Sequence, residues 1–317
     1  MTTPATQSAV LIGGSIAIDN VKTPTAEAVN LLGGSASYAS IAASYYARAV
    51  HLVGIIGKDF PEEHIQLLES RGIQLDGVER SSGNSFFWSG EYHENMNDRT
   101  THQVAVNVLE DWKVSVPASA AGAPIVVLAN MSPDNQLQLL DQCTAEQPFV
   151  VADTMDLWIS IANESLHRVL ERIDLFVINE GEAREFAGTS NLIVAGKRLL
   201  AKGPRHVVIK LGEFGAILFS STGEDSSPDL FRCAAFPLTD VADPTGAGDS
   251  FLGALAGHLA STGKAAFTFE DIRQAVVQGS VVASFTCEAF STRRLQTLTR
   301  SDIEERLAFL KSITHWP

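Results

Sequence analysis

The chain has 317 residues, of which 45% are hydrophobic and 19% charged, so its composition is that of a globular protein and not of a disordered one. Its 37 Asp and Glu against 23 Lys and Arg give a net charge of −14. This acidity argues against nucleic acid and against an anionic membrane surface as partners, because both attract basic proteins.

The cysteines and the apolar runs indicate the cellular compartment of the protein. Cys143, Cys233 and Cys287 are far apart and form no CxxC pair, which excludes a disulfide framework and a zinc knuckle. No run reaches the ~20 apolar residues of a membrane span, and the apolar stretch Ala9–Ile12 is too short for a signal peptide. We therefore expect a cytoplasmic protein without a membrane partner.

Short apolar runs alternate with helical patterns along the chain. The runs are rich in Val and Ile and predict buried strands at Ala9–Ile12, His51–Val53, Ile125–Ala129, Phe149–Ala152, Leu175–Ile178 and His206–Ile209. Helices are predicted at Ser35–Arg48, Pro61–Arg71, Asp134–Gln142, Asn163–Arg172, Leu192–Ala201, Thr245–Ser261, Glu270–Phe285 and Asp302–Ile313. Repeated strand and helix indicate parallel βαβ units and a layered α/β fold.

One region interrupts this alternation. Ser85–His93 alternates aromatic with smaller residues, Glu94–Asp98 is turn-like and Arg99–Val108 is again extended, a pattern that predicts a hairpin. Together with residues 15–32, residues 85–108 are expected to form a small β lid over one edge of the main sheet. The hairpin carries four aromatic side chains, Phe86, Phe87, Trp88 and Tyr92. They could stack on a nucleobase or cover a sugar, and the ordinary alternative is that they pack the hairpin onto the core.

The strongest chemical signal is the string Asp243-Pro-Thr-Gly-Ala-Gly-Asp-Ser-Phe251. Gly246 and Gly248 let the backbone turn with its N–H groups on one side, and the apolar spacing that follows is helical. Such a loop at a helix N-terminus binds anions. Asp249 lies inside it and is placed to accept a proton from a hydroxyl. Alone, the glycines and Asp249 would indicate only a turn and a helix cap; neither a Walker A loop nor a dinucleotide fingerprint is present.

The string resembles the C-terminal signature of the ribokinase-like, or PfkB, family of carbohydrate kinases. Further segments resemble that family in the same order, over about residues 9 to 310; they are Val10–Asp19, Gly33–Tyr38, Val53–Asp59, Asn179–Glu182 and Lys210–Gly215. The resemblance implies a ribokinase-like layered α/β/α domain over residues 1–317, with a mostly parallel central sheet and a small β lid.

The resemblance also implies roles for the residues around the glycine loop. Asp249 would be the catalytic base, and the backbone of Gly246, Ala247 and Gly248 would stabilise the transferring phosphoryl group. Thr245 would belong to the nucleotide side.

Other implied roles concern ATP, Mg²⁺ and the acceptor. Asn179 and Glu182 would position the phosphates and Mg²⁺, Glu182 through a water molecule. Lys210 would face the phosphates, with Gly212 and Gly215 lining the nucleotide pocket. Asp243 resembles a position of a monovalent-cation site, such as one for K⁺. The residues that would face the acceptor are Asp19, Gly33, Gly34 and Ser37.

Each of these residues also has an ordinary interpretation. Asn179 and Glu182 are three apart and share one helix face, so they fit a capping box as well as a phosphate site. Lys210 alone would be a strand-end lysine, and Asp19 alone a turn residue. Their common order along the chain favours the functional interpretation.

The first hypothesis is an ATP-dependent kinase for a hydroxyl of a small sugar or sugar acid, and the alternative is a nucleoside kinase of the same superfamily. Ala17, Ser35 and Tyr38 depart from residues common in the family, which leaves the sugar open. A phosphosugar kinase is less favoured, because the lid offers mainly Lys22 and Arg99 as cations. A silent sugar- or nucleotide-binding regulator would be expected to lose the anion loop, and a NAD-dependent oxidoreductase lacks its glycine fingerprint. A homodimer through the lid is left open.

Overall fold

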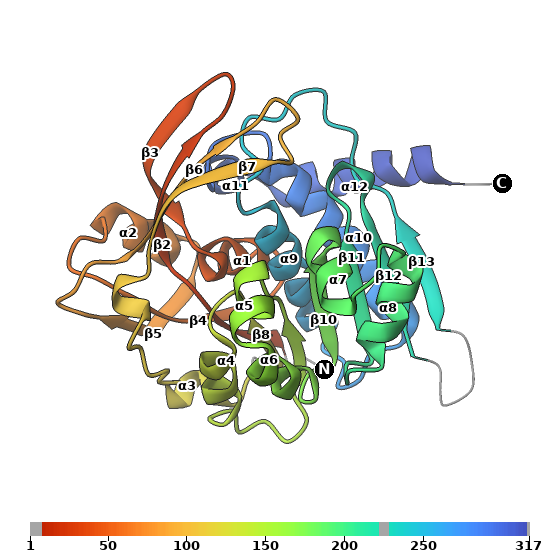
Figure 1. Cartoon of the computed structure of the whole chain (residues 1–317), viewed down its shortest axis with the longest axis horizontal. Coiled ribbons are helices and arrows are strands. Elements are labelled where there is room, and N and C mark those ends of the chain that lie inside the picture. Colours follow the sequence, from red (N-terminus) through yellow and green to blue (C-terminus); the bar gives the residue numbers. More distant parts are fainter. Residues whose placement is uncertain (1–7, 222–227, 316–317) are drawn as a thin grey trace.

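A nine-stranded sheet forms the centre of the molecule in the computed structural model, which describes residues 8–221 and 228–315 (Figure 1). In spatial order its strands are β13 (Asp229–Cys233), β12 (Ala216–Ser220), β11 (His206–Lys210), β10 (Leu175–Asn179), β9 (Phe149–Ala152), β8 (Ile125–Leu128), β1 (Ala9–Gly13), β4 (Ala49–Ile56) and β5 (Ile73–Arg80). All neighbours from β11 to β5 are parallel. At the other edge, β12 pairs antiparallel with β11, and β13 pairs antiparallel with β12.

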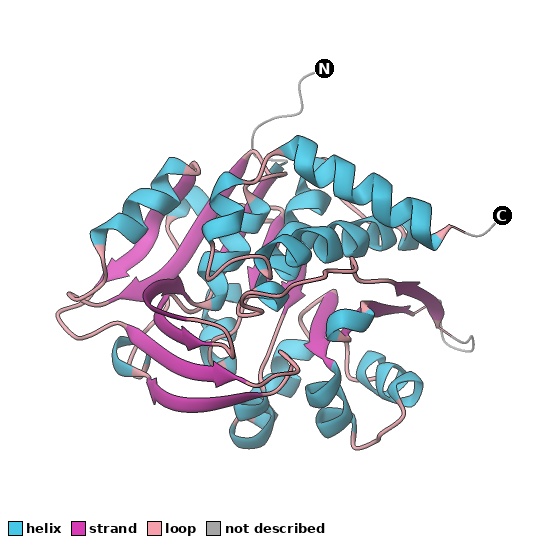
Figure 2. Cartoon of the chain, turned by 90° about the horizontal axis from the view of Figure 1, so that it is seen from above, coloured by secondary structure: helices cyan, strands magenta, loops and turns pink. Residues whose placement is uncertain are grey.

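Helices cover both faces of this sheet (Figure 2). One face carries α1 (Ser35–Ala43), α2 (Glu62–Ser70), α9 (Ala247–Ser261), α10 (Phe269–Thr286), α11 (Arg293–Thr297) and α12 (Arg300–Thr314). The other carries α3 (Ala118–Ala121), α4 (Pro133–Leu140), α5 (Asp156–Ile161), α6 (Asn163–Leu170), α7 (Glu180–Ala187) and α8 (Leu192–Leu200). Val10 and Ile12 of β1 face the first layer and Leu11 the second, so the strand is buried on both sides, as parallel strands require. The layered α/β/α fold is confirmed.

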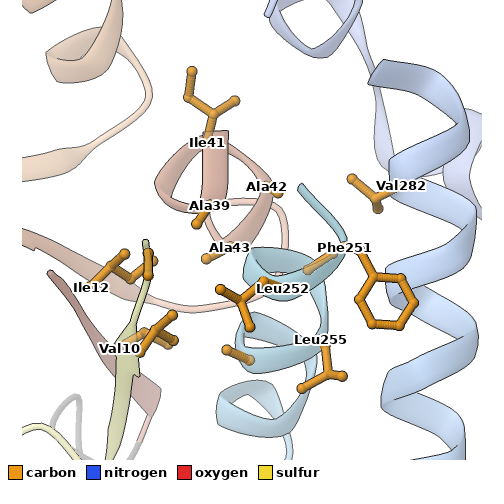
Figure 3. Packing of buried hydrophobic residues seen from close by; sticks show 14 of the residues in the cluster. Val10, Ile12, Ala39, Ile41, Ala42, Ala43, Phe251, Leu252, Leu255 and Val282 are labelled. Carbon is orange, nitrogen blue, oxygen red and sulfur yellow. The ribbon is translucent and has the colours of Figure 1, made fainter. Parts of the chain in front are cut away.

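Helices α1 and α9 pack closely against each other (Figure 3). A Cβ at Gly253 would lie 2.0 Å from the carbonyl oxygen of Ala39, and one at Gly257 would lie 2.7 Å from that of Ala43. The two helices can therefore approach only where side chains are absent or small. The contact runs along both helices: Gly253 in the middle of α9 meets Ala39, and Gly257 in its C-terminal half meets Ala43 at the end of α1.

A second, four-stranded sheet stands beside the large one (Figure 1). Its order is β3 (Glu27–Gly33), β2 (Ala17–Lys22), β6 (Phe86–Tyr92) and β7 (Arg99–Ala105). β2 and β6 run parallel, while β2–β3 and β6–β7 are antiparallel hairpins. Because β1 leads directly into β2, the small sheet begins at the carboxyl end of the main sheet. Two 3₁₀ turns adjoin the two sheets, at Asn107–Leu109 and Gly212–Phe214.

The structure differs from the sequence predictions mainly at the edges of the large sheet. The six predicted strands are present in β1, β4, β8, β9, β10 and β11, but β5, β12 and β13 were not predicted, nor were the short helices α3, α5 and α11. The helix predicted at Ser35–Arg48 ends at Ala43, and the chain then turns so that the Arg48 N–H bonds to the Ser8 carbonyl. In the described ranges no helix has both the length and the apolar character to span a membrane.

Candidate active site

The predicted residues gather at the carboxyl ends of the parallel strands, where β10 ends at Asn179 and β11 at Lys210. Asp153 follows the end of β9 in the same way. Ligands of open parallel sheets bind in the crevice at this edge. The N-terminus of α9 and the small sheet complete the surroundings of the site.

The glycine loop opens α9 as predicted. Gly246 is the N-cap with a φ of 77°, and a Cβ there would lie 2.3 Å from the ring of Tyr38, so only glycine fits. A Cβ at Gly248 would lie 3.0 Å from Lys210 Nζ. The lysine ammonium thus lies directly over the first turn of α9, where backbone N–H groups favour an anion.

Lys210 is held by a carboxylate that the sequence analysis did not single out. Its Nζ lies 3.1 Å from Oδ2 of Asp153, which is 4% exposed. Burial lowers the pKa of Lys210, but Asp153, Glu182 and other nearby carboxylates outweigh this and raise it, so the ammonium stays charged. The signal that could have found Asp153 is its place directly after a buried strand, which it shares with Asn179 and Lys210.

Asp249 lies in the first turn of α9, as predicted. Burial raises the pKa of its carboxyl to about 6, helped by the negative charge of Asp153, while Lys210 and Arg99 of the small sheet act in the opposite direction. A carboxylate with a pKa near neutrality is a suitable general base, because it is largely ionised at neutral pH and still accepts a proton.

Asn179 and Glu182 form the capping box of α7. Asn179 Oδ1 accepts the Glu182 N–H at 2.9 Å, and Glu182 Oε2 accepts the Asn179 N–H at 3.0 Å. Burial, and next the charge of Asp153, raise the pKa of Glu182, which Lys210 partly opposes. The pair therefore caps α7, and Glu182 also lies close enough to Asp153 and Lys210 to feel their charges.

The carboxylates around Lys210 are oxygen donors that fit a Mg²⁺ ion bound mainly through water molecules. Among residues 8–221 and 228–315, no group of three or more His, Cys, Asp and Glu side chains is placed to hold a metal ion. Asp153, Glu182 and Asp249 nevertheless all act on the charge of Lys210, and after burial the charge of Asp153 is the next cause that raises the pKa of Glu182 and of Asp249. Mg²⁺ prefers such oxygen donors and is usually bound by one or two carboxylates together with waters and phosphate oxygens.

Asp19 is the buried acid on the side of the small sheet. It is 5% exposed on β2, and its carboxylate fills the space of a missing side chain, since a Cβ at Gly33 would lie 2.1 Å from it. Gly34 has a φ of 89° and turns the chain into α1. Burial raises the pKa of Asp19 to about 8, and Asp243 and Asp249 add to the effect. Among the residues that the structure describes, no cation is a cause that opposes this rise.

Asp243 braces the glycine loop. Its Oδ1 accepts the Thr245 N–H at 2.9 Å and its Oδ2 accepts the Ser291 N–H at 3.0 Å. It has no exposed surface, and burial raises its pKa. The carboxylate thus joins the loop to the segment after α10.

Three of the predicted site residues, Ser37, Gly212 and Gly215, are closely surrounded by other parts of the chain. Ser37 is wholly buried in α1, and its Oγ has no hydrogen-bond partner among the described residues. A Cβ at Gly215, which has a φ of 92°, would lie 2.0 Å from the Cys233 carbonyl oxygen. A Cβ at Gly212 would lie 3.2 Å from Oδ1 of Asn97 in the β6–β7 turn.

The β6–β7 hairpin of the small sheet bonds to the glycine loop and to the turn after β11. Thr245 Oγ1 donates to Tyr92 OH at 3.3 Å, and Asn97 Nδ2 donates to Glu213 Oε1 at 3.4 Å. Tyr92 is buried, with Trp88 packed against the same small cluster, and Phe87 packs against the main core. The hairpin aromatics thus contribute mainly to packing.

Solved structures share this fold over almost its whole length. Ribokinase from Giardia lamblia superimposes with a TM-score of 0.78 and 19% identity, covering 96% of this chain and 99% of that one. A nucleoside kinase from Burkholderia thailandensis in complex with inosine gives 0.76 and 18%, covering 97% and 100%. The architecture is thereby that of the ribokinase-like kinases.

The sequence identifies the family more closely. A family model described as pfkB family carbohydrate kinase matches residues 17–298, and the chain belongs to this family. A cytidine kinase from Thermococcus kodakarensis is 27% identical over 251 residues, which are 78% of this chain and 88% of that protein. A 1-phosphofructokinase from Bacillus subtilis is 29% identical over 187 residues, 55% of this chain and 56% of that protein.

Proposed function

We propose that this kinase transfers the γ-phosphoryl group of ATP to a hydroxyl of a small sugar or sugar acid, with Asp249 as general base. The observation that carries the proposal is the position of Asp249 in the first turn of α9, in the loop over which Lys210 lies. Phosphoryl transfer depends mainly on alignment and on neutralisation of charge, and this arrangement supplies a base, backbone donors and a cation together.

The transfer step follows from these groups. The acceptor oxygen forms a bond to the γ-phosphorus as the bond to the bridging oxygen of ADP breaks, and its proton passes to Asp249. The N–H groups of Gly246, Ala247 and Gly248 stabilise the charge on the phosphoryl oxygens. Lys210, fixed by Asp153, neutralises the phosphates.

On the nucleotide side, we assign the phosphates to Thr245, Asn179 and Glu182, and the rest of ATP to the turn at Gly212 and Gly215. Mg²⁺, when bound, neutralises phosphate charge, and Glu182 would hold it through a water molecule. Asp243 would serve a monovalent cation such as K⁺.

On the acceptor side, Asp19 binds a hydroxyl, and Gly33, Gly34 and Ser37 shape the surrounding backbone. The ionised carboxylate accepts hydrogen bonds at both oxygens and donates none, so hydroxyls that donate to Asp19 would stabilise its charged form. The small sheet, which spans residues 17–33 and 86–105, would act as a lid over this acceptor.

A nucleoside is the second candidate acceptor. It is favoured by the similarity to a cytidine kinase over most of both chains. A base would need a surface other than Tyr92 and Phe87, because packing occupies both side chains. The net charge of −14 supports a small molecule and not a nucleic acid in either case.

The test is ADP release from ATP and Mg²⁺ over a panel of sugars, sugar acids, polyols and nucleosides. Release with a free sugar or sugar acid supports the proposal. Release with nucleosides alone favours the second candidate. If the protein binds ATP but releases ADP with no member of the panel, the result points to an acceptor outside the panel or to a silent binding protein.

A further inference from the structure

Ser85 is the centre of a buried hydrogen-bond node directly before β6. Only 1% of its surface is exposed. Its N–H and its Oγ both donate to Asp59 Oδ1, at 2.7 and 2.9 Å, and its Oγ accepts the Gly57 N–H at 2.9 Å. Asn107 Nδ2 donates to the Ser85 carbonyl oxygen at 2.8 Å. These four residues, Gly57, Asp59, Ser85 and Asn107, are called the Ser85 node below.

The Ser85 node joins both ends of the β6–β7 hairpin to the loop that follows β4. Ser85 precedes β6, and Asn107 follows β7 with a φ of 49°. A Cβ at Gly57 would lie 2.3 Å from the Ser85 nitrogen, so the loop approaches as closely as glycine allows. The segment Val53–Asp59, which the proposed phosphoryl transfer does not use, thus holds the base of the hairpin.

From the Ser85 node, β6 runs past the acceptor acid to the glycine loop. Phe86 pairs with Ala17 at the start of the β2–β6 ladder, and Trp88 pairs with Asp19. At its far end, Tyr92 accepts the hydrogen bond from Thr245. Together with β3 on the other side of β2, β6 therefore holds the strand that presents Asp19, and it also carries the hairpin's contact with the anion loop (Figure 1).

The two ends of the hairpin are held unequally. The bonds at the base are 2.7 to 2.9 Å long, and the bonds at the far end, to Thr245 and to Glu213, are 3.3 and 3.4 Å long. A cavity of about 510 Å³, lined in part by Asn84 and Asn107, borders the base on one side. The polar bonds at the base are therefore shorter than those at the far end, where Tyr92 is held mainly by apolar packing, so the base is the part of the hairpin that polar contacts fix most firmly.

We propose that Asp59 and Ser85 are positioning residues for the acceptor: they fix the base of β6 and thereby the place of Asp19. This inference rests on the proposed function for its kinetic consequence, but not for its structural one. Asp59 is not among the residues assigned above to the acceptor or to ATP, and its carboxylate bonds to Ser85. It acts through Ser85 and the β2–β6 ladder.

The kinetic test compares Asp59→Ala and Ser85→Ala with a matched control, Thr268→Ala. Thr268 makes the same pair of bonds, from its N–H and Oγ1 to Asp271 Oδ2 at 2.9 and 2.7 Å, but at the start of α10. Loss of a charge-assisted bond should raise the acceptor KM about tenfold in Asp59→Ala, with the KM for ATP unchanged. Asp59→Asn keeps an acceptor oxygen and should restore most of the affinity.

A second readout needs no substrate. Amide hydrogen exchange in Asp59→Ala should accelerate along β6 and β2, whereas in Thr268→Ala it should accelerate only at the start of α10. Exchange confined to residues 57–59, or an equal rise of the acceptor KM in Thr268→Ala, would overturn the positioning role. If no acceptor supports ADP release by the wild type, the proposed function fails, and the exchange result still decides the role of the Ser85 node.

Discussion

Replacing the ionisable carboxyl of Asp19 by the amide of Asn should make the protein more stable and less able to bind its acceptor. The carboxyl is buried on β2, and burial together with Asp243 and Asp249 raises its pKa from 3.8 to about 8. Between these two pH values the unfolded chain releases this proton while the folded protein retains it. Wild-type stability therefore falls as the pH rises from about 4 to about 8, and Asp19→Asn should escape that loss.

The size of the effect follows from the shift. Each pKa unit corresponds to about 1.4 kcal/mol, so the carboxyl costs at most about 4 kcal/mol at pH 7. Relaxation of the surroundings reduces this, and we expect Asp19→Asn to gain about 1–2 kcal/mol, in the usual range for one substitution. For a chain of this length that is a rise in Tm of a few degrees.

Thermal unfolding of both proteins between pH 4 and pH 8 measures the effect. The Tm difference in favour of Asp19→Asn should be small at pH 4 and grow with pH. Asp229→Asn, at an exposed position of β13, controls for the loss of one negative charge. A difference that does not grow with pH, or an Asp19→Asn protein less stable than wild type at pH 8, would refute the reasoning.

Two further predictions concern the glycine loop. The value of kcat/KM should rise with pH through about 6 as Asp249 ionises. Lys210→Met should move this rise to higher pH, because the Lys210 ammonium lowers the pKa of Asp249. A pH profile that does not move would exclude this effect of Lys210 on Asp249. Gly246→Ala should lower turnover and cost about 1–3 kcal/mol of stability, since the new Cβ would meet the ring of Tyr38 at a φ of 77°; a variant with normal turnover and Tm would show that the loop tolerates a side chain.

Local signals made the glycine loop and the central strands predictable. The string from Asp243 to Phe251 carries its turn and its helix within nine residues, so sequence alone places Asp249 in the first turn of α9. β8 is apolar on both faces and stands out for the same reason. By contrast, β5 exposes charged residues at the sheet edge, and the edge strand β13 exposes Asp229, Leu230 and Arg232, so neither shows a continuous apolar run.

Contacts between distant segments were the part that the sequence did not reveal. Asp153 meets Lys210 across 57 positions of sequence, and Asp59 meets Ser85 across 26. Neither pair leaves a pattern in its own segment, because the partner is supplied by the order of strands in the sheet. The capping box of Asn179 and Glu182 is the reverse case, a local pair that was predicted both as a cap and as part of the phosphate site.

The most direct test of the account is turnover by Asp249→Asn. With an acceptor that supports ADP release by the wild type, this variant should lose about 10²–10⁴-fold in kcat, the usual contribution of a general base, while ATP binding by calorimetry stays intact. A variant that turns over at nearly the wild-type rate would contradict the assignment of Asp249 as the base.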